Sequence, residues 1–432
     1  MIRFLYNLLF PIGLLLFLPG YLVKMRRRGN YRAKFGQRLG FYDNDLRSHL
    51  AGRRITWIHA VSVGEVAVAL KLAARLKELD NSFFGVLTTT TTTGFTFAIK
   101  ESPKWIEVMY NPIDFWPVTR RAFAVIQPVK IILVEAEVWP NLVAEAHQRR
   151  IPIALVNARL SPRSEGRFRK FRFFVAPVFR QLDLVCVQEL EDVARWIALG
   201  AIEGRIRRTG NIKYDLHELN LDRQAPREIL NSLGIDPERP IIFGGSTHAG
   251  EEIILTEVFL KLRAEFPSLF LIIAPRHVER AREVRAHLER LSLRVGLRSE
   301  TESTQPDCLV IDTTGELRNW YSVGTVAFVG KSLTARGGQN PVEPIIAGKP
   351  VIFGPHMENF ATLARSLIAH DAAIQIEDPD SLQNKIAKLL RDGAEREQLV
   401  ANATEVLAAH RGATASTAAF VIDLKSHAAS PR

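Results

Sequence analysis

The sequence predicts an α/β protein of two domains, each built on a parallel β-sheet. The chain has 432 residues, more than a single hydrophobic core usually holds. Short runs rich in β-branched and aliphatic residues alternate with amphipathic stretches, as they do in βαβ units. The chain is 47% apolar and 24% charged, so it can bury full-sized cores. This composition excludes a disordered or fibrous protein.

Five strand-like runs fall in the first half of the chain. They cover residues 55–61, 83–90, 129–140, 151–160 and 183–189. An amphipathic helix is expected directly after the first run, over residues 64–79. Threonine suits strands, so we expect the six-threonine run at 88–93 to be a strand end followed by a loop.

The second half repeats this alternation without a detectable sequence repeat. Its strand-like runs open the segments 241–252, 269–277, 308–317, 325–332 and 350–356. The stretch 210–240 is polar and rich in turn formers, so the boundary is predicted there. We expect domains at 25–215 and 216–426, and a disordered tail at 427–432. Two facing Rossmann-like domains with a cleft between them match the GT-B glycosyltransferase architecture best.

The N-terminus predicts a membrane anchor over residues 1–24. Residues 4–23 carry no charge, and 20 residues is about the length of a membrane-spanning helix. Seven cations follow between Lys24 and Arg38, and by the positive-inside rule we expect the rest of the chain on the cytoplasmic side of the membrane. No cleavage site for a signal peptide is visible. Asn7, Pro11 and Pro19 leave open a helix that lies in the membrane interface instead.

The net charge of +11 is concentrated in two stretches. Residues 1–42 hold eight cations and no acid, and residues 159–180 hold seven cations and one acid, so the remainder is slightly acidic. Such patches suit an anionic surface. Nucleic acid is one candidate, but the adjacent apolar run favours anionic lipid, and no nucleic acid partner is expected. Cys186 and Cys308 are too few for a disulfide scaffold or a multi-cysteine zinc site.

Glu65 is the first candidate catalytic residue. It lies in the first turn of the helix that follows the first strand, at the carboxyl end of that strand. In a parallel sheet this edge faces the ligand crevice, so the carboxylate could act as a general base. Ser62 and Glu65 also have the spacing of a capping box, a purely structural role. Both interpretations remain open on the sequence.

Glu135 is the second candidate, in the run 129–140. Glu135 and Glu137 are two residues apart, so in a strand they share a face. Either carboxylate could instead bind a nearby arginine.

The segment 330–344 is predicted to bind a nucleotide. Asn340 is a good N-cap, Pro341 suits the first helical position, and Glu343 could accept both hydroxyls of a ribose. Gly337 and Gly338 permit close approach of the backbone to a ligand, and helix N–H groups suit a phosphate. Lys331 and Arg336 add positive charge beyond what helix capping requires.

Two further loops add candidates for the same site. Ser246 and Thr247 follow a strand and two glycines, and Arg276 and His277 follow the next strand. Arg276 could make a charge-assisted bond to a phosphate. The candidate nucleotide-binding residues are Ser246, Thr247, Arg276, His277, Lys331, Gly337, Gly338, Asn340 and Glu343.

Other chemistries lack their motifs. The histidines at 59, 248 and 277 are not at zinc spacing, so no metal site is predicted. There is no G-x-S-x-G elbow, and the loop at 243–252 lacks the Gly-Lys-Ser/Thr ending of a P-loop.

Together, seven ordered blocks resemble the 3-deoxy-D-manno-octulosonic acid (Kdo) transferase family, whose members add Kdo to lipid A precursors in Gram-negative bacteria. The blocks are HAVSVGEVAVA, VEAEVWPNL, VNARLS, GNIKYD, GGSTHAGEE, PRHVER and GGQNPVEP with GKPVIFGP. The resemblance extends from the predicted anchor to about residue 400. The chain has Gln339 where many members have histidine, and Lys331 where a second glycine is expected.

The resemblance implies an inverting GT-B glycosyltransferase that uses CMP-Kdo as donor and needs no cofactor. It implies that the N-terminal half handles the lipid acceptor, with Glu65 as base and Glu135 on the acceptor side. Ser246, Thr247 and Arg276 would then line the CMP site together with Asn340 and Glu343. A GT-B enzyme that uses a UDP-sugar would share these loops, and a catalytically inactive nucleotide-binding scaffold is the rival from another class.

Overall fold

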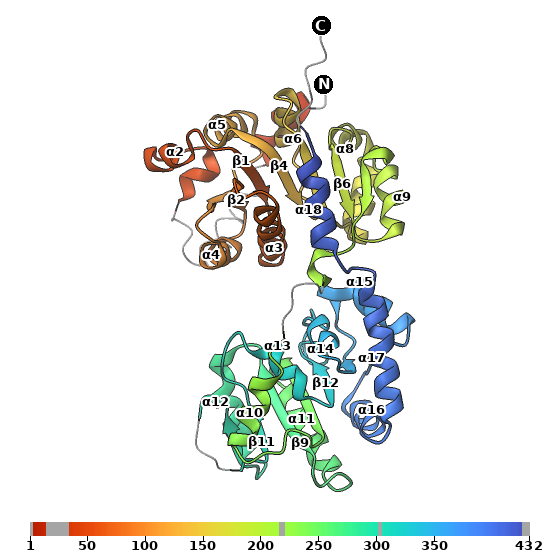
Figure 1. The fold of residues 1–432 in the computed structure, drawn as a ribbon. Helices are drawn as coiled ribbons and strands as arrows, with labels where there is room; N and C mark the ends of the chain where they lie inside the picture. The colour runs from red at the N-terminus through yellow and green to blue at the C-terminus, as the bar shows by residue number, and fades with distance from the viewer. Residues whose placement is uncertain (1–2, 14–33, 216–220, 301–304, 426–432) are drawn as a thin grey trace. The chain divides into compact units, whose positions relative to one another are not determined.

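The computed structural model describes residues 3–13, 34–215, 221–300 and 305–425. The chain forms two compact units (Figure 1). Unit 1 comprises Met1–Asp215 and His410–Arg432, and unit 2 comprises Leu216–Ala409. The tail predicted at 427–432 lies outside the described residues.

Unit 1 is built on a parallel seven-stranded sheet in the order β3-β2-β1-β4-β5-β6-β7. Its strands are β1 (Ile55–His59), β2 (Phe84–Thr89), β3 (Ile106–Tyr110), β4 (Pro128–Val134), β5 (Ile153–Ala158), β6 (Leu184–Val187) and β7 (Ile206–Arg208). All five residues of β1 are buried, because both faces of the sheet are covered. Trp57 packs into the core on one face and Ile58 into the core on the other. Strand order reverses between β1 and β4, which is where α/β sheets bind ligands.

The helices of unit 1 cover both faces of this sheet. They are α2 (Asn44–Leu50), α3 (Val63–Leu79), α4 (Thr92–Glu101), α5 (Trp116–Ile126), α6 (Pro140–Gln148), α7 (Pro162–Lys170), α8 (Arg172–Phe179), α9 (Leu190–Ala198) and α18 (Ala413–Asp423). The threonine run is a strand end, as expected, but only a short turn follows before α4 begins. Thr91 caps α4 by accepting a bond from the Gly94 N–H at 3.0 Å, so threonine here also starts a helix.

Unit 2 repeats the architecture with the order β10-β11-β9-β8-β12-β13-β14, again all parallel. Its strands are β8 (Ile241–Thr247), β9 (Phe270–Pro275), β10 (Val295–Leu297), β11 (Cys308–Val310), β12 (Val326–Val329), β13 (Val351–Phe353) and β14 (Ile374–Gln375). Its helices are α10 (Gln224–Ser232), α11 (Glu251–Leu262), α12 (Ala281–Glu289), α13 (Leu317–Trp320), α14 (Val342–Ile346), α15 (Ala361–Ala369), α16 (Pro379–Arg391) and α17 (Gly393–Ala408). Here the strand order reverses between β8 and β12.

The C-terminal helix corrects the predicted domain limits. The second domain was expected to continue to residue 426, but the chain returns to unit 1 at His410, and α18 packs on α3. Asp215 holds the start of α18, because its carboxylate accepts bonds from the N–H groups of Gly412 (2.9 Å) and Thr414 (2.7 Å). These partners are almost 200 residues apart in the chain, so no local sequence pattern predicts the contact.

The predicted anchor is described only in part. Residues 3–13 are helical, and residues 14–23 of the expected span lie outside the described residues. Within the described ranges, every helix is too short or too polar to cross a membrane.

Candidate active site

Glu65 takes part in a helix cap and is nearly buried, with 8% of its surface exposed. Ser62 is the N-cap of α3, and its hydroxyl donates to Glu65 Oε1 at 2.8 Å. The Val61 N–H donates to Oε2 at 2.9 Å. The predicted cap is therefore present, although the carboxylate bonds the N–H of Val61 in place of that of Ser62. Burial raises the pKa of Glu65, and the charge of Glu135 raises it further.

Glu135 directly follows β4, the neighbour of β1 in the sheet. Its φ is 62°, so it lies in the left-handed region that few residues other than glycine adopt. Lys213, in the short 3₁₀ helix Ile212–Tyr214, donates to Glu135 Oε1 at 2.6 Å. The expectation that Glu135 and Glu137 share a strand face is wrong. The strand ends at Val134, and both glutamates lie in the turn and loop before α6.

Glu137 joins the other two carboxylates electrostatically. Burial raises its pKa to about 7, and the charges of Glu65 and Glu135 contribute to the rise. We call Glu65, Glu135, Glu137 and Lys213 the acid cluster. A carboxyl group with a pKa near 7 can hold or release a proton at physiological pH.

The segment that carries Lys213 is fixed by buried amides. The Ile212 N–H donates to Asn157 Oδ1 at 3.0 Å, and Asn211 Nδ2 donates to Gln188 Oε1 at 2.8 Å. Asn157, at the end of β5, has a φ of 51°. The segment that carries Lys213 is thereby held by Asn157 at the end of β5 and by Gln188 directly after β6.

In unit 2, the loops after β8 and β12 are joined by one buried carboxylate. Glu251, at the start of α11, accepts bonds from the N–H groups of His248 (2.8 Å), Lys331 (2.7 Å), Ser332 (2.9 Å) and Leu333 (3.0 Å). Glu251 is fully buried, so these bonds lie in a low-dielectric environment. They fix the loop that carries Lys331 against the start of α11.

The backbone between these two loops is strained and tightly packed. Ser246 has a φ of 53° and Lys331 a φ of 56°. A Cβ on Gly330 would lie 2.3 Å from the Ser246 carbonyl oxygen, so only glycine fits there. The hydroxyl of Thr247 is buried and has no hydrogen-bond partner within the part of the chain that the structure describes. Strain and an unpartnered hydroxyl are typical of binding sites.

Arg276 and Glu343 lie beside these loops. The Arg276 N–H donates to the Thr247 carbonyl at 3.0 Å, and the Arg276 side chain is exposed. Burial raises the pKa of Glu343, and the positive charges of Arg318 and Arg276 oppose the rise. His277 is exposed, and its ring lies 5.9 Å from that of His248.

Two details of the segment 330–344 differ from the expectation. The helix begins at Val342, one residue later than predicted, and has five residues, although Asn340 Oδ1 still accepts a bond from the Val342 N–H at 3.1 Å. Gly337 and Gly338 have positive φ, and a Cβ on Gly338 would meet Met357 Sδ at 2.5 Å. Packing within unit 2 therefore accounts for the glycine at 338 without any ligand.

The comparisons with known proteins identify the family. A family model described as 3-deoxy-D-manno-octulosonic-acid transferase matches residues 33–216. The Kdo transferase of Haemophilus influenzae is 35% identical over 388 residues, which cover 89% of this chain and 89% of that protein. The chain belongs to the Kdo transferase family.

Other Kdo transferases agree. The Kdo transferase of Bordetella pertussis is 35% identical, and the match covers 84% of this chain and 85% of that protein. The Kdo transferase of Chlamydophila psittaci is 30% identical, and the match covers 91% of this chain and 90% of that protein. The family predicted from the seven blocks is therefore confirmed, and this Kdo transferase is a glycosyltransferase.

Solved structures confirm the α/β fold class and its GT-B-like form. UDP-GlcNAc 2-epimerase from Neisseria meningitidis matches with a TM-score of 0.57, covering 85% of this chain and 99% of that one at 12% identity. Anabaena HepE in complex with UDP matches with a TM-score of 0.56, covering 86% and 100% at 13% identity.

In this Kdo transferase, the structure brings the sequence candidates together in two groups, one in each unit. Glu65 and Glu135 interact in the acid cluster, and Ser246, Thr247 and Arg276 adjoin the loop of Lys331. Sequence analysis did not select Lys213 or Glu251 as site residues. Lys213 could have been found as the lysine within the GNIKYD block. Glu251 could have been found as a carboxylate in the first helical turn after a glycine-rich loop. Among the described residues, no group of three or more His, Cys, Asp or Glu side chains could hold a metal ion.

Proposed function

We propose that this Kdo transferase transfers Kdo from CMP-Kdo to a lipid A precursor with inversion, and that Glu65 is the general base. The acid cluster carries the proposal. Glu65 follows β1 and Glu135 follows β4, at the reversal of strand order in the sheet of unit 1. The raised pKa of Glu65 strengthens it as a proton acceptor.

The step is a single displacement. Glu65 takes the proton of the acceptor hydroxyl while the hydroxyl oxygen forms a bond to the anomeric carbon of Kdo. The bond from that carbon to the phosphate oxygen breaks on the opposite face, and CMP leaves with the electron pair. One displacement inverts the anomeric configuration.

Two other members of the acid cluster, Lys213 and Glu135, would assist Glu65 in this step. The ammonium of Lys213 lowers the pKa of Glu65, opposing the effect of burial, and so favours the ionised form that can accept a proton. Glu135 would lie on the acceptor side. Its carboxylate is held in place by Lys213 and would orient a sugar hydroxyl of the acceptor. The left-handed backbone of Glu135 is a strain of the kind that persists at functional sites.

Unit 2 would hold the nucleotide. The hydroxyl of Thr247 lacks a partner among the described residues, and the exposed Arg276 bonds the Thr247 carbonyl through its backbone N–H. One phosphate diester carries one negative charge, which a guanidinium can stabilise as CMP departs. The Glu343 carboxylate would accept the ribose hydroxyls, with Asn340 Nδ2 3.3 Å from its Oε1. His277, Lys331, Gly337 and Gly338 complete the proposed contacts, and no cofactor is required.

We also propose the cytoplasmic face of the inner membrane as the site of action. The helix at residues 3–13 exposes Phe4 (73%) and Leu8 (58%), and the basic helix α7 is exposed in the same unit. Such surfaces suit anionic lipid. Residues 4–13 would then lie in the membrane interface, because Asn7 binds Asn141 of α6 and holds this helix on unit 1.

Mass spectrometry of the product tests the function. Incubation with CMP-Kdo and a tetraacylated lipid A precursor should add Kdo to the precursor, and CMP should inhibit where UDP does not. Inhibition by UDP would favour a UDP-sugar donor, and nucleotide binding without any product would favour an inactive scaffold.

A further inference from the structure

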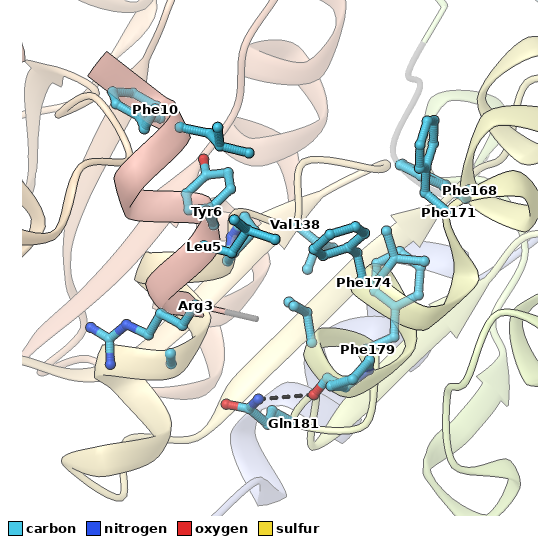
Figure 2. Close-up of a pocket in the computed structure, with 16 residues that line it drawn as sticks. Arg3, Leu5, Tyr6, Phe10, Val138, Phe168, Phe171, Phe174, Phe179 and Gln181 are labelled. Atoms are coloured by element: carbon cyan, nitrogen blue, oxygen red, sulfur yellow. Dashed lines mark hydrogen bonds between the residues drawn. The ribbon is translucent and has the colours of Figure 1, made fainter. Parts of the chain in front are cut away.

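Unit 1 contains an apolar pocket of about 540 Å³ that the proposed reaction does not use (Figure 2). The helix at residues 3–13 forms one wall, with Leu5, Tyr6 and Phe10. The opposite wall comes from α7 and α8, which contribute Phe168 and Phe174 among others. The volume lies in the range of ligand sites.

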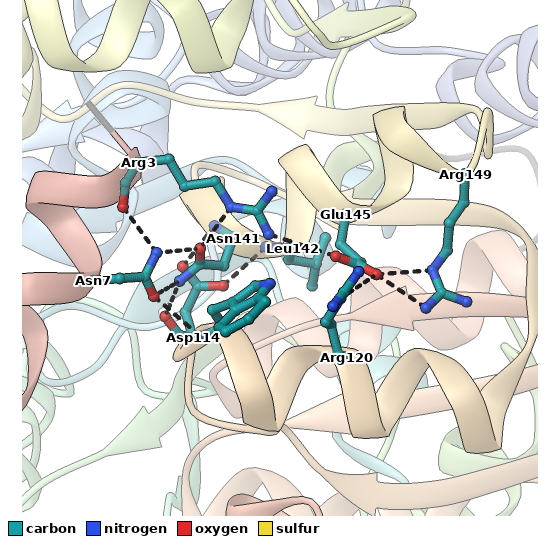
Figure 3. A network of polar contacts seen from close by, with 9 residues as sticks. Arg3, Asn7, Asp114, Arg120, Asn141, Leu142, Glu145 and Arg149 are labelled. Carbon is teal, nitrogen blue, oxygen red and sulfur yellow. Dashed lines mark hydrogen bonds and ion pairs between the residues drawn. The ribbon is translucent and has the colours of Figure 1, made fainter. Parts of the chain in front are cut away.

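The N-terminal wall is fixed by specific polar bonds (Figure 3). Asn7 and Asn141 exchange two side-chain amide bonds of 2.8 and 2.9 Å, and Arg3 Nε donates to Asn141 Oδ1 at 3.1 Å. Asp114 is buried and caps α6 by accepting the N–H groups of Asn141 and Leu142, both at 2.9 Å. A wall held in this way is a built part of unit 1.

The pocket adjoins the acid cluster through two shared elements. In the loop before α6, Glu137 belongs to the acid cluster and Val138 lines the pocket. On α7, the charge of Arg167 acts on Glu137, while Phe168 lines the pocket. A molecule whose reacting hydroxyl reached Glu65 would therefore have its apolar part near this pocket.

Helix α7 and the residues that follow it contribute Phe168 and Phe171 to the pocket, and this segment is basic and aromatic. Helix α7 carries four exposed cations, and α8 begins with a fifth: Arg163, Arg167, Arg169, Lys170 and Arg172. Glu165 is the one acid in this stretch, and it is paired with Arg169 and Arg195. Phe171 is 45% exposed and Phe173 64% exposed. Cations on the same segment as the residues of an apolar cavity complement a ligand with an anionic head and an apolar chain.

We propose that this pocket binds one acyl chain of the phosphorylated glycolipid acceptor, with the cations of α7 facing its phosphate. The inference rests on the proposed function, since it names the part of the acceptor that unit 1 holds. It also gives the first residues of the chain a role in substrate binding in addition to membrane attachment.

A pocket-filling substitution tests the proposal. Ala144 is half-buried on α6 and lines the pocket, so Ala144→Trp should fill it, while Gln148→Trp on the exposed end of the same helix is the control. We expect Ala144→Trp to raise the KM for an acylated acceptor at least about tenfold, the equivalent of about two displaced methylenes. Transfer to the same phosphorylated disaccharide without its acyl chains should be unchanged, and Gln148→Trp should change neither. An equal effect on both acceptors, or none, would overturn the proposal.

Photolabelling provides a readout that does not depend on transfer or on the variant. A fatty acid with a diazirine should label wild-type full-length protein within residues 3–13 and 168–181, and the acylated acceptor should suppress this labelling. Labelling elsewhere overturns the proposal. Suppression by bilayer phospholipid but not by the acceptor overturns the choice of occupant. If wild-type protein transfers Kdo to neither acceptor, the proposed function fails, and the labelling still decides the pocket.

Discussion

Both units are built on a parallel seven-stranded sheet in which the strand order reverses once beside the first strand, and the two reversal points differ in their charges. At the reversal of strand order in unit 1, three carboxylates and one lysine form the acid cluster, and burial raises the pKa values of Glu65 and Glu137. At the equivalent position in unit 2, the buried Glu251 is fully engaged by backbone N–H groups, while Arg276 stays exposed. The difference teaches that similar parallel sheets can carry loops of different charge, and under the proposed function these loops would determine whether a site moves a proton or holds an anion.

Replacing Glu65 should reduce turnover more than any other substitution proposed for the two units. A small effect would contradict the contrast drawn between the two units. Glu65→Gln cannot take the acceptor proton, so turnover should fall on the order of a hundred- to ten-thousand-fold. Melting should change little, because glutamine retains one of the two bonds that the carboxylate accepts. Ser62→Ala is the matched control, since it removes the cap hydroxyl, costs about 1 kcal/mol of stability and leaves the base in place. Near-normal turnover of Glu65→Gln would return Glu65 to a purely structural role.

In unit 2 the corresponding carboxylate should matter for structure. Glu251→Ala leaves four backbone N–H groups without an acceptor, so the free energy of unfolding should fall by about 3 kcal/mol or more. CMP affinity should fall with it, because the loop of Lys331 loses its attachment. Denaturant unfolding of unit 2 and CMP titration measure both effects. Unchanged stability would show that the loop does not depend on Glu251.

Lys213 sharpens the account of unit 1. Lys213→Met removes a positive charge that lowers the pKa of Glu65, so that pKa should rise. The acid limb of the kcat/KM profile should therefore move to higher pH, with a rate loss of about 10- to 100-fold at pH 7. A uniform loss of rate with no shift of the profile would assign Lys213 a structural role alone.

The smallest effect concerns stability and pH. The folded-state pKa of Glu137 is about 7 against an ordinary value of 4.5, so folding favours the protonated form. Wild-type stability should fall as pH rises from 4.5 to 7, and Glu137→Gln should lack this loss. The variant should be more stable than wild type by about 3 kcal/mol at pH 8, with the difference vanishing near pH 4. A difference that does not vary with pH would contradict the assigned pKa.

Local patterns predicted the parts of the fold that local physics determines. The strand at 55–61, the helix after it and the cap at Ser62 follow from hydrophobic period and capping chemistry. Contacts between residues that are distant in the sequence could not be predicted from local patterns. Lys213 meets Glu135 across 78 positions, and Glu251 meets Lys331 across 80. The return of α18 to unit 1 is of the same kind.

One error came from backbone conformation. The spacing of Glu135 and Glu137 is that of a strand face only if the strand continues, and the left-handed φ of Glu135 ends it. The carboxylates nevertheless interact, because the acid cluster is assembled from loops that follow neighbouring strands. Residue types at strand ends were therefore a better guide to the site than their exact geometry.

The central claim is that unit 1 supplies the base and unit 2 holds the nucleotide, and calorimetric titration of CMP into Glu65→Gln and Arg276→Ala tests it most directly. The account predicts that Glu65→Gln binds CMP as wild type does. It predicts that Arg276→Ala binds CMP about 10- to 100-fold more weakly, the usual loss for a bond to a charged group. Unchanged CMP affinity in Arg276→Ala, or lost affinity in Glu65→Gln, would contradict this division of roles.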